Sequence, residues 1–170
     1  MIEILILYKL NKKVLTMYGV SKEIKKSFSV LTTPSYGTIK PALRRLEAKN
    51  FVKTQKTMSE GGRPSTYYSI TKEGTEELKR LITCQPQENP VMFLTTARIK
   101  LACADLLSEE EFDLMIKQLQ FKAENILLDT QSLLKEYEAD FYLKMVFDNL
   151  TCEYGNFLSL LKGLEHAGAR

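Results

Sequence analysis

A turn between two strand-like stretches limits the possible folds, because the rest of the chain shows helical periodicity. Residues 58–64, with the sequence MSEGGRP, contain two glycines and a proline and form the strongest turn signal in the sequence. Residues 51–57 before the turn alternate in polarity, and residues 65–70 after it are rich in threonine, tyrosine and isoleucine, which strands favour. Two strands joined by a Gly-Gly tip predict a β-hairpin. The predicted fold class is therefore mainly α with a small β-hairpin.

Helical periodicity predicts three helices before this hairpin and one after it. The predicted helices span residues 2–11, 16–28, 38–50 and 71–83. The first is short, and its alternating isoleucines suit a strand equally well, so periodicity leaves it open. In the third, Ile39, Leu43 and Leu46 recur at i, i+4 and i+7 and mark the buried face. Gly37 and Pro41 fall on the opposite face, where small residues let the backbone approach another molecule closely.

The second half of the chain is predicted to be wholly helical. Its helices are expected over residues 90–106, 108–137 and 143–164. Residues 84–90 contain two prolines and show no periodicity. We therefore predict a linker at 84–90 between a first domain at 1–83 and a helical domain at 91–170.

The two longest predicted helices carry apolar residues at alternating steps of four and three, which is typical of coiled-coil seams. Such seams pack on each other as an antiparallel hairpin in one chain, or on helices of a second copy. The last helix also carries Tyr142, Met145 and Val146, more apolar surface than one seam needs, which favours an interface between chains. We therefore predict an antiparallel helical dimerisation domain. The predicted contact residues are Leu143, Phe147, Leu150, Tyr154, Phe157 and Leu161.

The net charge of +3 conceals an uneven distribution of charged residues. Residues 1–83 carry 16 lysines and arginines against 7 aspartates and glutamates, whereas residues 84–170 carry 8 against 14. A basic half joined to an acidic half indicates a polyanion-binding domain fused to a domain that repels polyanions. Charge drift between small domains is the alternative explanation.

The residue content also argues against several classes of protein. The cysteines, Cys84, Cys103 and Cys152, are widely spaced without a CxxC pair, so we expect reduced thiols in the cytoplasm. With one histidine, His166, and no nucleophile–base pair or ligand cluster, we expect no enzyme, metal or cofactor. The longest apolar run, residues 4–8, is far shorter than the roughly 20 residues that span a bilayer, so no membrane partner is expected.

The order helix, helix, helix, hairpin, helix predicts an N-terminal winged helix-turn-helix domain. Two motifs occur in this order, SYGTIKPALRRLE at 35–47 and GGRPSTYYSITKEG at 61–74. They resemble the recognition helix and the wing of PadR-type transcriptional regulators, and Tyr18-Gly19 lies where that family has a glycine near the start of its second helix. The resemblance covers residues 2–83. The helical remainder is similar in length and character to the dimerisation domain of the longer PadR subgroup.

The predicted DNA contacts lie mainly on the third helix, where outward-facing arginines can bind guanine edges or phosphates. Hydroxyls at the start of that helix can bind phosphate together with its N–H groups. Lys40 departs from the PadR pattern, which usually has an aromatic residue there, and a lysine would contact phosphate. Tyr18 and Val20, beside Gly19, depart from it too. The full predicted set is Ser35, Tyr36, Thr38, Lys40, Arg44, Arg45, Arg63, Lys22 and Lys26.

These features predict a sequence-specific DNA-binding regulator that acts as a homodimer on a palindromic operator, with repression as the expected effect. Its expected partners are double-stranded DNA and a second copy of the chain. A small-molecule effector, if one exists, would occupy an apolar pocket between the two halves or at the dimer interface. The alternative is a winged-helix module that assembles with other proteins without DNA. Steep salt dependence of duplex binding would distinguish the two.

Overall fold

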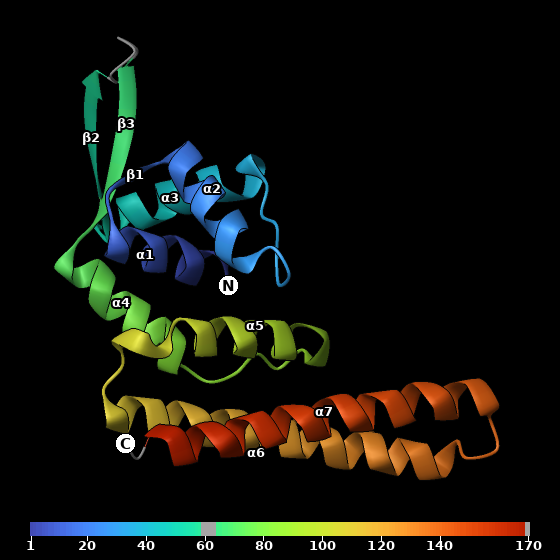
Figure 1. Ribbon diagram of the computed structural model, residues 1–170. Helices are drawn as coiled ribbons and strands as arrows, with labels where there is room; N and C mark the ends of the chain where they lie inside the picture. Colours follow the sequence, from blue (N-terminus) through green and yellow to red (C-terminus); the bar gives the residue numbers. More distant parts are fainter. Residues whose placement is uncertain (59–63, 169–170) are drawn as a thin grey trace. The chain divides into compact units, whose positions relative to one another are not determined.

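A computed structural model describes residues 1–58 and 64–168, with side chains as far as residue 165. Its elements are α1 (Ile2–Lys12), β1 (Leu15–Thr16), α2 (Met17–Phe28), α3 (Tyr36–Ala48), β2 (Val52–Met58), β3 (Pro64–Ile70), α4 (Lys72–Thr83), α5 (Pro90–Ala102), a 3₁₀ turn (Ala104–Leu106), α6 (Glu109–Glu136) and α7 (Phe141–Gly168) (Figure 1). The predicted class, mainly helical with a small β element, is confirmed. Over the described ranges, no helix has both the length and the apolar character needed to cross a membrane.

The chain forms two compact units. Unit 1 comprises Met1–Cys84 and Leu94–Leu106, and unit 2 comprises Gln85–Phe93 and Leu107–Arg170. The division falls inside α5 as well as after α4, because most of α5 belongs to unit 1. That an independent domain ends at residue 83 stays a prediction.

α1 is the central helix of unit 1, and its burial resolves the ambiguity of its sequence. Ile4, Leu5, Ile6 and Leu7 follow one another, and none is more than 3% exposed. Consecutive apolar residues suit a helix that is covered on several sides, and α1 packs against α2, α3 and α4. The short apolar run therefore supplies the core on which the other helices of this unit rest.

The sheet has three antiparallel strands in the order β1-β3-β2. β2 and β3 form the predicted hairpin, which extends beyond the helices of unit 1 in Figure 1. β1 was not predicted, because a two-residue strand has no periodicity and depends on a distant partner. Leu15 pairs with Tyr68 and Thr16 with Tyr67. Since β1 leads directly into α2, this pairing attaches the base of the hairpin to the helices.

α3 begins at Tyr36, two residues before the predicted start, so Pro41 lies inside the helix. The predicted inward stripe is confirmed, because Ile39, Leu43 and Leu46 are at most 1% exposed. Pro41 lies on the exposed side, where the carbonyl that its missing N–H leaves unpaired can bind water. The helix therefore keeps a buried apolar face and an open outer face.

Close backbone contacts join the end of α3 to the start of α4. Asn50 has a φ of 59°, the left-handed conformation expected of a helix stop. Thr71 caps α4 by accepting a hydrogen bond from Gly74 N–H at 2.9 Å, and its hydroxyl donates to Asn50 O at 2.7 Å. A Cβ on Gly74 would lie 2.0 Å from Phe51 O. Because β2 and β3 lie between these two helix ends, the contacts fix the base of the hairpin beside α3.

Unit 2 contains the antiparallel pair α6 and α7, which lie side by side in Figure 1. A capping box of Ser108 and Glu111 begins α6. Phe93 stacks on Tyr154, with ring centroids 6.3 Å apart, and meets Phe157 edge-on at 5.9 Å. The apolar seams of α6 and α7 therefore pack largely on each other. They also pack on Phe93, at the end of the segment Gln85–Phe93 that belongs to unit 2.

Candidate nucleic-acid interface

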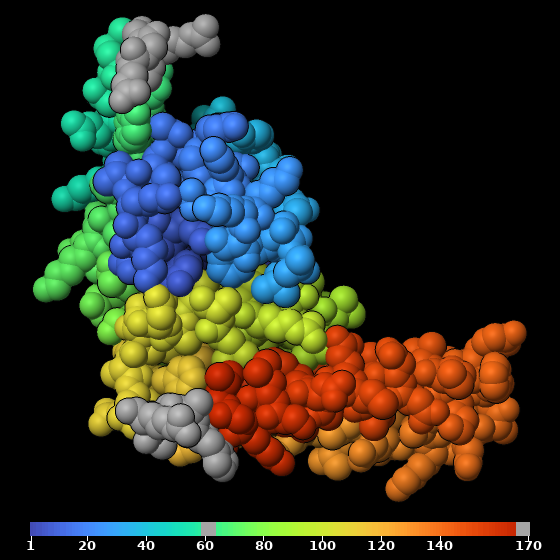
Figure 2. Space-filling view, in the orientation of Figure 1, coloured from blue at the N-terminus to red at the C-terminus, as the bar shows by residue number. Residues whose placement is uncertain are grey.

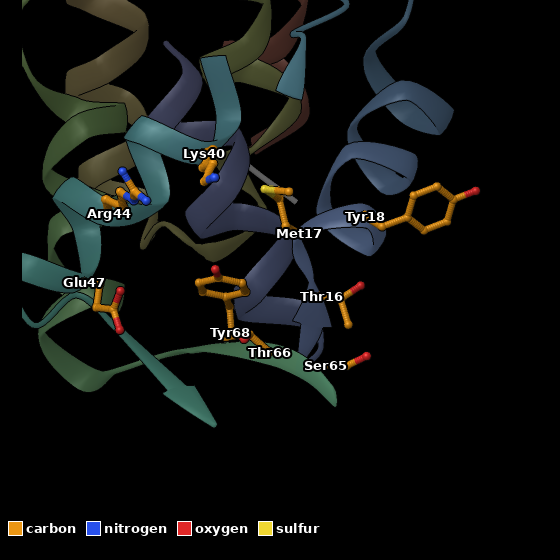
Figure 3. A pocket seen from close by; sticks show the side chains of 9 residues that line it. All are labelled: Thr16, Met17, Tyr18, Lys40, Arg44, Glu47, Ser65, Thr66 and Tyr68. Atoms are coloured by element: carbon orange, nitrogen blue, oxygen red, sulfur yellow. The ribbon is translucent and has the colours of Figure 1, made fainter. Parts of the chain in front are cut away.

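A groove lies between the outer face of α3, the N-terminus of α2 and strand β3, and it has a volume of about 450 Å³ (Figure 3). Lys40, Arg44 and Glu47 line it from α3. Tyr68 rises from β3 toward that helix in Figure 3. The remaining lining residues are Thr16, Met17, Tyr18, Ser65 and Thr66. This groove joins the two parts of a winged helix-turn-helix that contact DNA, the recognition helix and the wing.

All the predicted contact residues within α3 are exposed, namely Tyr36, Thr38, Lys40, Arg44 and Arg45. Lys40 and Arg44 are exposed and lie one turn apart on the wall of the groove, and Tyr36 is 47% exposed at the helix start. Ile39, Leu43 and Leu46 form the buried face of the helix, so these side chains point to the opposite, exposed face. The face can therefore present two cations and a phenol to a polyanion.

The N-terminus of α3 borders a second hollow of about 460 Å³, which contains Lys25 of α2. Ser35 occupies the N-cap position but makes no capping hydrogen bond with its side chain. Its hydroxyl instead lies 3.2 Å from the hydroxyl of Thr38. N–H groups in the first turn of a helix lack partners within the helix and attract anions. Both predicted hydroxyls thus lie where a phosphate can bind.

Arg45 differs from its neighbour Arg44. Its Nε donates to Glu3 Oε1 of α1 at 3.0 Å, and it does not line the groove. The sequence placed Arg45 among the outward residues, but the ion pair with α1 depends on a tertiary contact that a helical wheel does not contain. Arg45 therefore connects α3 to α1 in this structure.

Of the nine residues that line the groove, the sequence predicted only Lys40 and Arg44 as DNA contacts, and the seven that it missed include Glu47 and Tyr68. Glu47 accepts a hydrogen bond from Thr54 Oγ1 of β2 at 2.6 Å, so α3 is joined to the hairpin. Tyr68 is half-buried and lines the groove. Burial, with the charge of Glu47 as a smaller cause, raises the pKa of Tyr68 above its ordinary value of 10.0, so its phenol stays protonated and can donate a hydrogen bond. Because Tyr67 and Tyr68 are adjacent in a strand, their side chains lie on opposite faces, but the sequence does not say which face borders α3.

The remaining predicted contacts are on α2 and the wing. Lys22 and Lys26 are exposed on α2 but line neither hollow, whereas their neighbour Lys25 lines the second one. Arg63 lies outside the described residues. Of these three lysines of α2, the structure places Lys25 in the hollow beside the start of α3.

The predicted dimerisation residues have different surroundings along α7. Tyr154, Phe157 and Leu161 are at most 3% exposed within the chain. Phe147 and Leu150 are half-buried, and Phe147 packs on Tyr137 with ring centroids 6.2 Å apart. Leu143 alone of the six is exposed, at 38%. This seam thus mainly holds α6 and α7 together.

A second apolar stripe remains exposed on α6. Leu114, Phe121 and Leu128 recur every seven residues and are 53%, 67% and 61% exposed. On α7, the surplus residues noted in the sequence are also exposed, Met145 at 55% and Val146 at 54%. The space-filling view in Figure 2 shows the surface of α7 along much of its length. A heptad spacing on an exposed helix face is the pattern that packs on another helix.

Comparisons with known proteins find one family model and several solved structures that are similar to this chain. The transcriptional regulator PadR-like family matches residues 6–80. A PadR family transcription regulator from hypervirulent Clostridium difficile R20291 is 34% identical, over 46% of this chain and 79% of its own, with a TM-score of 0.42. Bacillus subtilis PadR is 21% identical in its complex with operator DNA, over 98% of both chains, with a TM-score of 0.46. In complex with p-coumaric acid it is also 21% identical, over 99% of this chain and 95% of its own, with a TM-score of 0.42.

No curated protein matches the chain.

The winged helix-turn-helix and its groove define a DNA-binding transcriptional regulator as the class of protein. The family match over residues 6–80, together with the 34% identity to a relative that is 79% covered, makes the assignment specific. The chain belongs to the PadR-like family of transcriptional regulators.

Proposed function

We propose that this chain is a homodimeric repressor that binds a palindromic DNA operator through α3 and the β2–β3 wing. The observation that carries the proposal is the groove in which Lys40 and Arg44 of α3 lie opposite strand β3. The helix places its outer face in the major groove, and the wing follows the adjacent backbone. Arg44 contacts a base edge or a phosphate, and Lys40 contacts phosphate.

The start of α3 supplies a second point of attachment. Ser35 and Lys25 line the second hollow, and the hydroxyl of Thr38 lies 3.2 Å from that of Ser35. A backbone phosphate bound there orients α3 along the groove of the duplex. Lys22 and Lys26, exposed on α2, add attraction to the backbone at longer range.

Homodimerisation is supported by the exposed stripe of α6. Leu114, Phe121 and Leu128 are too regularly spaced and too exposed for an isolated soluble helix. A second copy that packs its own α6 and α7 on this stripe covers it and supplies a second recognition helix. Two identical recognition helices require two inverted half-sites, which is the basis for a palindromic operator.

A small-molecule effector is a further part of the proposal. A hollow of about 520 Å³ in unit 2 lies beside the proposed interface and includes Phe121, Lys117 and Lys122. The lining also contains Glu88, so its aromatic face with two lysines and one carboxylate suits a small aromatic molecule with an anionic group. Binding beside Phe121 would alter the dimer contact and hence the distance between the two recognition helices.

The proposal is tested by titrating full-length protein with duplex DNA at several salt concentrations. Phosphate contacts release counterions, so the logarithm of the affinity should fall steeply and linearly with the logarithm of the salt concentration. A flat dependence would instead favour a winged-helix module for protein assembly. For repression, a bound site placed over a reporter promoter should lower expression, and increased expression would contradict that part of the proposal.

A further inference from the structure

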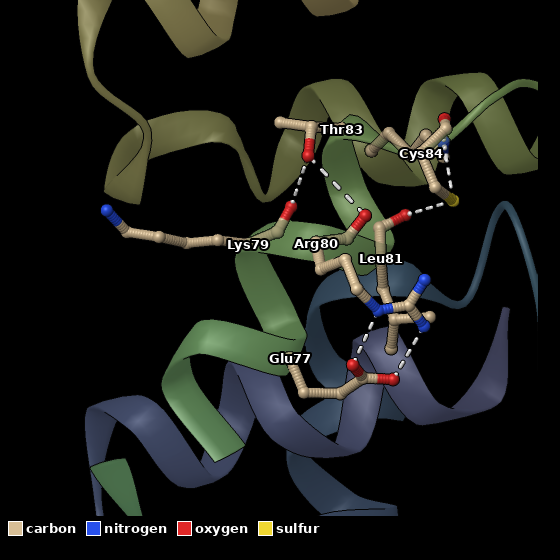
Figure 4. A network of polar contacts seen from close by, with 7 residues as sticks. Glu77, Lys79, Arg80, Leu81, Thr83 and Cys84 are labelled. Carbon is tan, nitrogen blue, oxygen red and sulfur yellow. Dashed lines mark hydrogen bonds and ion pairs between the residues drawn. The ribbon is translucent and has the colours of Figure 1, made fainter. Parts of the chain in front are cut away.

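The end of α4 brings a cysteine and a buried lysine together, outside the DNA-binding groove. Cys84 is the C-cap of α4, and its N–H donates to Arg80 O at 2.8 Å. Its thiol donates to Leu81 O at 3.1 Å, a contact drawn in Figure 4. Nζ of Lys100, on α5, lies 3.6 Å from Cys84 Sγ and donates to Cys84 O at 2.6 Å. Both residues belong to unit 1.

Lys100 is an unusual lysine because it is only 3% exposed. A buried ammonium is costly unless a charged partner compensates it. The contacts of its amine among the described residues are the carbonyl and the thiol of Cys84. Burial, the largest effect, lowers the pKa of Lys100 below its ordinary value of 10.5, while Cys84 acts in the opposite direction. The neutral amine that burial favours carries a nucleophilic lone pair.

The sulfur of Cys84 differs from the other thiol of unit 1 in its access to solvent. Cys84 is half-buried, which leaves it more open to a small oxidant than a fully buried thiol. Cys103 is fully buried, and burial raises the pKa of its thiol to about 12, which keeps it as an unreactive thiol. Oxidation within unit 1 is therefore directed to Cys84, whose sulfur lies 3.6 Å from Lys100 Nζ.

We propose that Cys84 and Lys100 form an oxidative modification site, at which a hydroperoxide generates a covalent S–N bond between the two side chains. In the first step, the thiol attacks hydrogen peroxide, giving a sulfenic acid, Cys–S–OH, and water. In the second, Lys100 Nζ attacks the sulfur, the S–O bond breaks, and the hydroxyl leaves as water with a proton from the amine. Sulfur is oxidised by two electrons and the peroxide is reduced by two.

The cross-link joins the end of α4 covalently to α5. In the reduced protein, one hydrogen bond of 2.6 Å and the contact of 3.6 Å connect these groups. A small thiol reverses the bond by attacking sulfur, which releases the amine and leaves a mixed disulfide that a second thiol reduces. The site therefore takes hydroperoxides as its substrate and thiols as its reductant.

The test is mass spectrometry of the full-length protein after treatment with hydrogen peroxide. The cross-linked peptide pair is expected to be lighter by two hydrogen atoms than the sum of its two reduced peptides. Trypsin cleaves after Arg80, Arg98, Lys100 and Lys117, but the modified lysine is no longer a substrate. Peptide 81–98 should therefore be found joined to an uncleaved peptide 99–117. Dithiothreitol should restore both separate peptides and cleavage after Lys100.

The same digest excludes the nearest alternative. A disulfide between Cys84 and Cys103 has the same mass loss, but it leaves Lys100 cleavable, so 81–98 would be joined to 101–117 instead. Finding that pair, or oxidised Cys84 without any link to Lys100, would overturn the proposal. Lys100→Met should abolish the cross-link while Cys84 is still oxidised, and Cys84→Ser should abolish both. Because the wild-type digest decides the result, failure of either variant to fold does not affect it.

Discussion

At the scale of single residues, two neighbouring arginines on α3 have different surroundings. Arg44 lines the groove beside β3, whereas Arg45 forms an ion pair with Glu3 on α1. The helical wheel predicted that both arginines face outward, and both are exposed. A helical wheel does not contain the position of α1, so the different partners of Arg44 and Arg45 follow only from the tertiary structure.

Arg44→Ala is predicted to weaken DNA binding with little effect on stability. An exposed arginine contributes typically within about 0.5 kcal/mol to folding, but roughly 1–3 kcal/mol of discrimination at a base edge. The measurement is affinity for specific and scrambled duplexes at several salt concentrations, with a thermal melt. Arg45→Ala is the matched control and should retain the wild-type affinity, with a stability loss of at most about 1 kcal/mol. Equal loss of affinity in both variants would contradict the assignment of the groove.

Gly74→Ala is predicted to destabilise unit 1 by about 1–3 kcal/mol, because an added Cβ would meet Phe51 O at 2.0 Å. The backbone carbonyl cannot turn away without disturbing the base of the hairpin. Gly37→Ala is the control, since its Cβ would lie 3.5 Å from Ser35 Oγ, and alanine favours a helix by up to about 1 kcal/mol. Thermal or urea unfolding measures both changes. Similar melts for the two variants would show that this close approach is not required.

At the scale of elements, the sequence predicted those with a strong local pattern. The hairpin followed from the turn at 58–64, and the buried face of α3 from Ile39, Leu43 and Leu46. β1 could not be predicted, because its two residues are specified by pairing with Tyr67 and Tyr68. The sequence predicted a start of α3 at residue 38, but the helix begins at Tyr36 and tolerates Pro41 on its exposed side.

The sequence pattern of the two long helices also does not identify their packing partner. Apolar residues at steps of four and three predict a seam, but such a seam can pack on a helix of the same chain or of a second copy. The structure assigns Tyr154 and Phe157 to packing within the chain, and the exposed stripe of α6 was not noticed in the sequence. It has a regular spacing of seven at Leu114, Phe121 and Leu128, which was a detectable signal.

Leu128→Glu is predicted to convert the proposed dimer to monomers. A carboxylate at a side chain that is 61% exposed in the single chain costs little folding energy, but it is desolvated without a partner at an interface. Sedimentation at a series of concentrations measures the oligomeric state. Val30→Glu is the control, because Val30 is 92% exposed in unit 1 and the change in charge is the same. A Leu128→Glu protein that sediments like the control would place the interface elsewhere.

At the scale of the whole molecule, the division of α5 bears on which fragment folds. Unit 1 includes Leu94–Leu106, whereas the sequence predicted a domain that ends at residue 83. The linker was inferred from two prolines, and composition does not show that a later helix returns to the first unit. Ile99 and Cys103, both fully buried, lie in this returning segment.

A fragment of residues 1–106 is therefore predicted to unfold cooperatively at a higher temperature than a fragment of residues 1–83. The shorter fragment loses the burial of Ile99 and Cys103. Both should bind DNA more weakly than the full chain, since neither contains α6 and α7 to supply the second half-site. Calorimetry and duplex titration at matched salt measure the two effects. Equal melting of the fragments would support a domain that ends at residue 83.

The central claim is that two copies of the chain each place one α3 in a major groove of the same duplex. Selection of bound sequences from a pool of random duplexes, with full-length protein, tests it most directly. The account predicts enrichment of two inverted half-sites whose centres are about one helical turn, roughly 10 base pairs, or a multiple of it apart. Arg44→Ala should relax the preference at one position of each half-site. Enrichment of a single unpaired half-site, or of no sequence at all, would contradict the account.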